Sequence, residues 1–412
     1  MKKIDSASVV LICPHYIPDK GGLAGHTAVL GTEIAALGVR TTVVTRPGPV
    51  ADTFPGAHIS PTIAHWSLRG MPALYRQTVA AQPDVVLIQY VPYMYWRRGP
   101  GVSVSLFALW LAFKGYRVVA IVHEAYIPWS KRPRLLAVGL VQRLALCVLI
   151  VSCTRVATST SSLTRMLRRW LPFAQSKMHT VPVFSNIPLI EMSEPERSAR
   201  RKRLSIEPDD VALVYFGSQH EGKLFGMVLR AFRMLYTRGY PVVLLVIGQQ
   251  KDAVLERVKD WNGSIGQHVV ATGYCSDNDV SFYLRCGDIF LSPFLDGVST
   301  RRGSVMAALQ HGLPVVTTVG PATDRALFAD AVAMTAIGDE EGYVRAVEDL
   351  LRDPLTRWAL GKRGHDLSER AFSWPLISKQ LLQLGGLDRD EEPITTVAPV
   401  TPRSPDKELS RQ

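Results

Sequence analysis

The sequence predicts an α/β protein built from two doubly wound halves. Runs of β-branched residues alternate with segments of helical length, and this alternation occurs twice along the 412 residues. A polar and charged segment at 185–210 separates the two series. The length suits two or three domains with substantial cores. We therefore predict two parallel sheets, each covered by helices on both faces.

The first half, residues 1–184, opens with a strand at 7–13 and a glycine-rich loop. The strands predicted after it are 40–45, 84–90, 116–124, 155–159 and 178–183. The predicted helices are 25–38, 72–82, 102–113, 133–152 and 161–170. Segment 133–152 is apolar, but Gln142 and Arg143 occupy its middle, where an arginine costs about 2.5–3.5 kcal/mol in a bilayer. We expect a buried or interfacial helix there, not a membrane-spanning one.

The segment 185–210 is predicted to be a linker, and the second domain follows at 211–365. Its predicted strands are 211–217, 241–248, 268–273, 288–294 and 314–318. Its predicted helices are 222–238, 251–261, 277–286 and 303–311, with more helix over 338–386. We expect 366–386 to be a helix that packs back on the first domain. Residues 387–412 have no periodic apolar face and are expected to be disordered.

Composition restricts the partners. The net charge of +11 favours an anionic partner such as nucleotide phosphates or acidic lipid headgroups. Nucleic acid is disfavoured, because the aromatic and basic residues form no recognised binding module. Five cysteines without a CxxC pair or metal spacing favour the cytoplasm, and the amino terminus has no cleavage site. Segments such as 93–99 and 165–170 mix aromatic with basic residues, which favours peripheral contact with the anionic inner face of the cell membrane; the alternative is that the apolar helices of this half are core.

Two loops carry the functional argument, because ligands of doubly wound sheets bind beyond the carboxyl ends of the strands. In "DGVSTRRGS" (296–304), Gly303 begins a helix and leaves backbone N–H groups open, while Arg301 and Arg302 offer planar cationic groups to phosphate oxygens. The alternative is a solvated charged turn. In "GSQHEGK" (217–223), Gly217 ends a strand and Lys223 supplies a mobile cation; the alternative is an ordinary solvent-facing lysine. This is not a Walker loop, because Leu224 follows the lysine.

Four motifs of the second half, in this order along the chain, resemble the carboxyl-terminal half of a GT-B glycosyltransferase. They are "GSQHEGK", "IGQQ" (247–250), "ATGYCSDNDVSFYLRCGDIFLSPF" (271–294) and "DGVSTRRGSVMAALQHGLPVVTT" (296–318). They are most similar to the large retaining family that uses nucleotide-sugar donors. The first half resembles the family more loosely, through "DKGGLAGH" (19–26), "IVHEAY" (121–126), "ATSTSSL" (157–163) and "VPVFSNIP" (181–188). The resemblance implies two Rossmann-like domains facing each other across a cleft. It also implies a UDP- or GDP-sugar donor, no cofactor and no metal, and a glycan or lipid-linked sugar as acceptor.

The resemblance also implies roles for individual residues. Lys223 would hold the donor diphosphate, Gly217 would let it approach, and Asp296 takes the place of the first of two family glutamates, near the donor sugar. Gly273 and Tyr274 would border the nucleobase. The other residues assigned to donor binding are Ser218, Gly248, Gly297, Ser299, Arg301, Arg302, Gly303 and Ser304.

In the first half, His123 would point from a strand end toward the reacting sugar; the alternative is a hydrogen-bonded structural histidine. We assign catalysis to His123, Lys223 and Asp296. On the acceptor side we place Gly21, Gly22, His26 and Glu124, although His26 at a helix start could equally be a cap.

Two positions depart from the family pattern. The family usually has arginine where this chain has Ser218, and its second glutamate falls on Ser304. We expect Arg301 or Arg302 to replace the missing cation. The alternatives are a catalytically silent nucleotide-binding scaffold and a nucleotide-sugar epimerase. A dehydrogenase is disfavoured, because neither half has G-x-G-x-x-G after its first strand.

Overall fold

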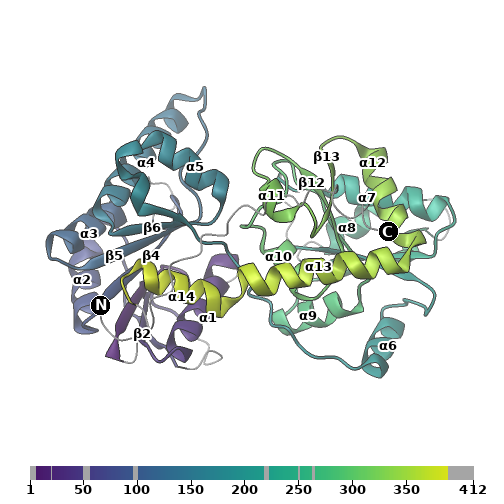
Figure 1. Cartoon of the computed structure of the whole chain (residues 1–412), viewed down its shortest axis with the longest axis horizontal. Helices are drawn as coiled ribbons and strands as arrows, with labels where there is room; N and C mark the ends of the chain where they lie inside the picture. Colours follow the sequence, from purple (N-terminus) through teal and green to yellow (C-terminus); the bar gives the residue numbers. More distant parts are fainter. Residues whose placement is uncertain are drawn as a thin grey trace, which may run out of the picture. The chain divides into compact units, whose positions relative to one another are not determined.

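The computed structural model describes residues 6–19, 21–49, 56–95, 101–217, 222–248, 251–261 and 265–387. The chain divides into two compact units. Unit 1 comprises the described residues up to Asn186, Thr300–Gly303 and those from Phe372 onward; unit 2 comprises Ile187–Ser299 and Ser304–Ala371. Each unit holds one parallel sheet flanked by helices, as the sequence predicts (Figure 1).

The sheet of unit 1 has the strand order β3-β2-β1-β4-β5-β6-β7. Its strands are β1 (Ser8–Ile12), β2 (Arg40–Thr45), β3 (His58–Pro61), β4 (Val85–Tyr90), β5 (Arg117–Val122), β6 (Arg155–Thr158) and β7 (Met178–Thr180). β1 and β4 are buried along their whole length, which explains their nearly continuous apolar sequences. The edge strand β3 was not predicted from the sequence.

Among the residues described, six α-helices cover the sheet of unit 1. They are α1 (Gly22–Ala36), α2 (Met71–Ala80), α3 (Val102–Phe113), α4 (Pro133–Ser152), α5 (Ser161–Trp170) and α14 (Trp374–Leu384). α14 comes from the end of the described chain and packs beside α1 (Figure 1). It is anchored by Trp374, whose Nε1 donates to the Ser185 carbonyl at 2.7 Å.

The sheet of unit 2 has the order β10-β9-β8-β11-β12-β13. Its strands are β8 (Val211–Phe216), β9 (Val242–Ile247), β10 (Val269–Gly273), β11 (Ile289–Ser292), β12 (Val315–Val319) and β13 (Ala333–Ala336). The helices are α6 (Glu194–Arg203), α7 (Phe225–Thr237), α8 (Lys251–Val258), α9 (Asp277–Cys286), α10 (Gly303–Gln310), α11 (Arg325–Phe328), α12 (Glu340–Arg352) and α13 (Pro354–Phe372). The strand β13 and the helix α6 were not predicted from the sequence.

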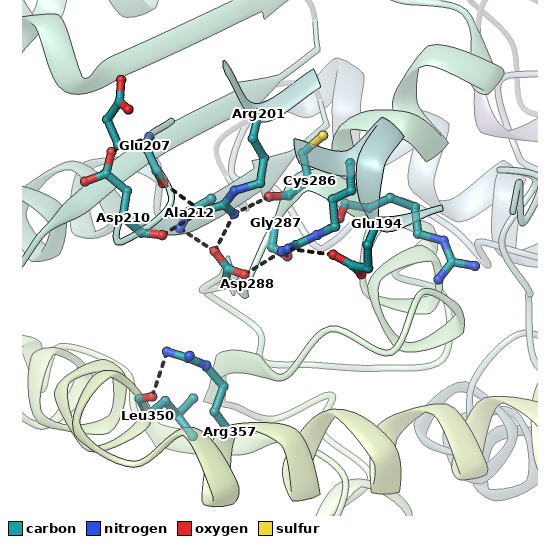
Figure 2. Close-up of polar contacts among 12 residues, drawn as sticks. Glu194, Arg201, Glu207, Asp210, Ala212, Cys286, Gly287, Asp288, Leu350 and Arg357 are labelled. Carbon is teal, nitrogen blue, oxygen red and sulfur yellow. Dashed lines mark hydrogen bonds and ion pairs between the residues drawn. The ribbon is translucent and has the colours of Figure 1, made fainter. Parts of the chain in front are cut away.

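The segment interpreted as a linker contains α6 and is part of unit 2 from Ile187 onward. Figure 2 shows how α6 is held: Arg201, only 6% exposed, donates to Asp288 at 2.8 Å and to the Cys286 and Asp210 carbonyls. The other carboxylate oxygen of Asp288 accepts from Arg197 at 2.7 Å. A charged helix is therefore fixed by buried charge-assisted hydrogen bonds, not by an apolar face.

The helix α4 is long and apolar enough to cross a membrane by length and composition, with 33% of its apolar window buried. Gln142 at its centre is fully buried and its Oε1 accepts from the Ile127 N–H at 2.9 Å. Arg143 lies over the rings of Tyr126 and Trp129, each 3.9 Å from its guanidinium carbon. The two polar side chains thus have partners inside unit 1. The opposite side of α4 exposes a row of apolar side chains: Leu136, Leu140, Leu144 and Val151.

Candidate active site

The chain of unit 2 changes direction across its sheet between β8 and β11. From β8 it proceeds through β9 to β10 on one side, and from β11 through β12 to β13 on the other. The loops that follow β8 and β11 therefore diverge from neighbouring strand ends, which is where doubly wound sheets bind ligands. Both loops singled out by the sequence, after Gly217 and around Asp296, lie at this point.

The two loops pair with each other. Lys223 and Phe294 form an antiparallel bridge, the Leu224 N–H donates to the Pro293 carbonyl, and the Leu295 N–H donates to the Gly222 carbonyl, both at 3.0 Å. The backbone of Lys223 is consequently fixed from both sides. α7 begins two residues later, at Phe225.

The ammonium group of Lys223 returns to the end of β8. Its Nζ donates to the Phe216 carbonyl at 3.2 Å and lies 5.4 Å from the ring centre of Tyr215. Gly217 has φ +115°, and a Cβ at this glycine would clash with Nζ. The lysine cation and the exposed backbone of Gly217 are thus adjacent, which suits an anionic group that contacts both.

Three adjacent strands of unit 2 end in glycines with positive φ: Gly217 after β8, Gly248 after β9 and Gly273 in β10. The Gly217 N–H donates to the Ile247 carbonyl at 3.0 Å, and the Gly248 N–H donates to the Gly273 carbonyl at 3.1 Å. A Cβ on Gly248 would lie 3.1 Å from the Gly217 carbonyl oxygen. The row leaves this edge of the sheet free of side chains at three points. Tyr274, 59% exposed, follows it.

Asp296 is half-buried in the loop after β11, and the loop after β12 fixes its backbone. Its carbonyl accepts from the Ala322 N–H at 2.9 Å, and a Cβ on Gly320 would clash with it. Gly297 has φ +82° and faces Gly320 equally closely, while Ser299 is buried. The sequence analysis missed Gly320, although its place directly after the strand-like run "VVTTV" (315–319) was a signal of the same kind as Gly217.

The next four residues, Thr300–Gly303, group with unit 1. The Val183 N–H donates to the Thr300 carbonyl at 3.2 Å, and Arg301 Nη1 lies 3.9 Å from Glu124 Oε1. Both charged side chains are more than a third exposed, so the pair contributes little to stability.

Three predicted donor residues cluster where this loop ends. Arg302, Gly303 and Ser304 are half-buried at the start of α10. A Cβ on Gly303 would meet no atom within 4 Å. Ser218 lies outside the described residues. Among the residues that the structure describes, no group of three or more His, Cys, Asp or Glu side chains is arranged to hold a metal ion.

In unit 1, His123 follows β5 and belongs to a chain of three polar side chains. Its Nε2 lies 2.5 Å from Oε1 of Gln89 on β4, and Nε2 of Gln89 lies 3.1 Å from Nδ1 of His26 on α1. The two imidazole rings meet edge to face with centres 5.1 Å apart. Gln89, fully buried, was not predicted; the signal was a lone amide in the apolar run "DVVLIQY".

Burial keeps both histidines neutral. It lowers the pKa of His123 to about 4 and the pKa of His26 well below its usual value. His26 is 4% exposed and packs edge-on against Trp374 of α14, with ring centres 5.1 Å apart. The alternative that His26 caps the helix is wrong, because the N-cap of α1 is Gly21. Gly21 and Gly22 are open, since a Cβ on either would meet no atom within 4 Å.

Comparisons with known proteins agree with this architecture. Residues 210–353 match the family model for Glycosyl transferases group 1. Sucrose-phosphate synthase from Thermosynechococcus elongatus is similar in structure with a TM-score of 0.69 and 17% identity, over 92% of this chain and 98% of that one. HepE from Anabaena, solved in complex with UDP and glucose, has a TM-score of 0.66 and 12% identity over 92% and 98%. WaaG, a glycosyltransferase involved in lipopolysaccharide biosynthesis, has a TM-score of 0.60 and 17% identity over 92% and 100%.

No protein with a curated function matches the sequence. The structural likenesses extend over almost the whole described chain, and the family match coincides with the sheet of unit 2 that carries Lys223 and Asp296. The chain therefore has the GT-B fold of these glycosyltransferases, and residues 210–353 of its second unit match the group 1 glycosyl transferase family.

Proposed function

We propose that this glycosyltransferase takes its sugar from a UDP- or GDP-sugar and binds the donor diphosphate between Lys223 and the glycine row of unit 2. The observation that carries the proposal is the ammonium group of Lys223, held at 3.2 Å from the end of β8 against Gly217. The structure of Anabaena HepE in complex with UDP-glucose supports a uridine nucleotide as the first donor to test. Tyr274, exposed beyond Gly273, is available to border the base.

The residues of unit 2 suit a reaction in which a diphosphate departs. Cleavage of the sugar–phosphate bond leaves negative charge on the diphosphate and positive character on the sugar. A cation placed beside the diphosphate lowers that barrier. The acceptor hydroxyl then attacks the sugar from the face that the diphosphate leaves, and a departing phosphate oxygen takes its proton. The anomeric configuration is retained, and no metal is needed to neutralise the leaving group.

A lysine substitution with a matched control tests the donor site. We expect Lys223→Met to raise the Kd for UDP or GDP by roughly 10-fold to 150-fold, because charge-assisted hydrogen bonds contribute about 1.5–3 kcal/mol. Lys259→Met removes an exposed lysine of unit 2 that pairs with Glu256, and should leave the Kd unchanged. Equal affinity in wild type and Lys223→Met would show that the diphosphate binds elsewhere.

Turnover distinguishes the transferase from a nucleotide-binding scaffold. Purified protein is offered UDP- and GDP-sugars with and without a chelator, and free nucleotide is followed. Slow release that persists in the chelator and disappears in Lys223→Met supports a metal-independent transferase. Tight binding without release on any donor or acceptor supports the scaffold.

The acceptor that we propose is a lipid-linked sugar at the inner face of the cell membrane. On unit 1, Trp110 and Phe113 of α3 are 47% and 79% exposed, and Lys114 lies 4.8 Å over the Trp110 ring. A cavity of about 760 Å³ beside them is lined mainly by apolar side chains of α2 and α3, with Arg76 among them. Apolar side chains flanked by cations suit an anionic leaflet, where each basic residue contributes about 1 kcal/mol.

Vesicle binding tests this surface. We expect the protein to sediment with phosphatidylglycerol vesicles at low salt and less so at high salt. The double variant Trp110→Ser, Phe113→Ser should lose most of this binding, whereas Leu355→Ser, which changes a 79% exposed leucine of unit 2, should not. Binding that is unaffected by the double variant would assign the contact to another surface.

A further inference from the structure

Gln89 lies between His26 and His123 in the hydrogen-bonded series of three side chains, and its amide is neither an acid nor a base. It is fully buried on β4, in a strand whose other five residues are apolar or aromatic. A buried amide is costly unless its polar atoms have partners. Here both ends are used: Oε1 meets His123 at 2.5 Å and Nε2 meets His26 at 3.1 Å.

These two contacts determine which ring nitrogens carry protons. An amide oxygen can only accept, so Nε2 of His123 must be protonated and donate to Gln89. An amide NH₂ group can only donate, so Nδ1 of His26 must be unprotonated and accept. Because burial keeps both rings neutral, each has one proton, and Nδ1 of His123 retains its lone pair.

Among the described residues that lone pair has no hydrogen-bond partner. Nδ1 of His123 also does not belong to the unpaired polar atoms that are fully buried, so it is accessible. It is available to accept a hydrogen bond from a sugar hydroxyl. The direction of this lone pair depends on three neighbouring side chains. Gln89 holds His123, His26 holds Gln89, and Trp374 packs against His26 with ring centres 5.1 Å apart. Trp374 itself is held by the Ser185 carbonyl.

We propose that Gln89 is a positioning residue, which holds His123 in the Nε2–H tautomer with Nδ1 presented as the acceptor for a substrate hydroxyl. The inference rests on the proposed glycosyl transfer for its effect on turnover. It stands independently of that function for the proton positions, which can be measured in the free protein.

The direct test is the tautomer of His123. Histidine-selective ¹⁵N labelling with long-range ¹H–¹⁵N correlation distinguishes protonated from unprotonated ring nitrogens, and His123→Gln and His26→Gln assign the signals. We expect His123 as Nε2–H and His26 also as Nε2–H in the wild-type protein. A His123 signal in the Nδ1–H form overturns the proposal.

Two substitutions of Gln89 separate positioning from packing. Gln89→Leu keeps the volume and removes both hydrogen bonds; Gln89→Glu keeps an acceptor for Nε2–H of His123. We expect Gln89→Leu to lower kcat by about tenfold to a hundredfold with the KM for the nucleotide sugar within about twofold, because the side chain of Gln89 contacts His123 and His26 and none of the residues proposed to hold the diphosphate. Gln89→Glu should recover at least part of this kcat and keep the Nε2–H signal of His123.

Gln142→Leu is the matched control, since Gln142 is also a fully buried glutamine of unit 1 but contacts the Ile127 backbone and no histidine. It should lower stability without a change in kcat or in the His123 signal. A folded Gln89→Leu protein with wild-type kcat, or Gln89→Glu no more active than Gln89→Leu, overturns the proposal. If wild type releases no nucleotide from any donor, the proposed function fails, while the ¹⁵N measurement still decides the tautomer.

Discussion

The substitution Gly217→Ala tests the link between the glycine row and the lysine cation. Gly217 has φ +115°, a region that side-chain-bearing residues rarely occupy, so alanine there carries a backbone strain of about 1–3 kcal/mol. Its new Cβ also clashes with Lys223 Nζ, and the ammonium group must leave the end of β8. Loss of its interaction with a diphosphate costs about 1.5–3 kcal/mol, which corresponds to a roughly 10-fold to 150-fold higher Kd.

Gly239→Ala separates these two effects. Gly239 also has positive φ, +85°, but a Cβ there would meet no atom within 4 Å. Both variants should therefore lower the melting temperature, by roughly 2–4 °C for each kcal/mol of strain in a unit of this size. Only Gly217→Ala should weaken nucleotide binding in isothermal titration calorimetry.

A double variant tests whether the effect passes through the lysine. Gly217→Ala combined with Lys223→Met should bind UDP no more weakly than Lys223→Met alone, because the same interaction cannot be lost twice. Wild-type affinity in Gly217→Ala would refute the reasoning. Additive losses would show that Gly217 acts through its own backbone and not through Lys223.

Three further predictions concern charge and protonation. Arg301→Ala or Arg302→Ala should raise the Kd for donor nucleotide about tenfold in the same calorimetric assay, and wild-type affinity in both variants would exclude these arginines from the diphosphate site. Asp288→Asn should destabilise unit 2 by about 3–5 kcal/mol in urea unfolding, since Arg201 loses its buried counter-charge; Lys202→Met on the exposed side of α6 should have little effect. Burial lowers the pKa of His311 from 6.5 to about 4, so the unfolded chain takes up the proton first. The free energy of unfolding should fall by about 3 kcal/mol as the pH decreases from 6.5 to 4, and this component should be absent in His311→Gln.

Four helices were predictable to the residue. The helices at 102–113, 133–152, 161–170 and 277–286 match the bounds predicted from the sequence. The edge strands β3 and β13 were not predicted, because each has four residues and neither is buried along its length. The helix α6 was missed for a different reason. Its sequence EPERSARRKR has no apolar face, and the contacts that hold it, such as Arg201 to Asp288, join residues 87 positions apart.

The residues of the candidate site also include some that could be predicted from the sequence and some that could not. The strand-end glycines and Lys223 could be predicted, because a parallel sheet brings the carboxyl ends of its strands to one edge whatever the details of packing. Gln89 could not be given a role from the sequence, since its partners come from β5 and α1, 34 and 63 residues away. A lone amide in an apolar strand requires a partner, but only the three-dimensional structure identifies the partner as a histidine at a strand end. For a doubly wound sheet, the sequence of the loops can therefore suggest the ligand site. The partners of a buried polar residue within a strand, by contrast, become known only from the structure.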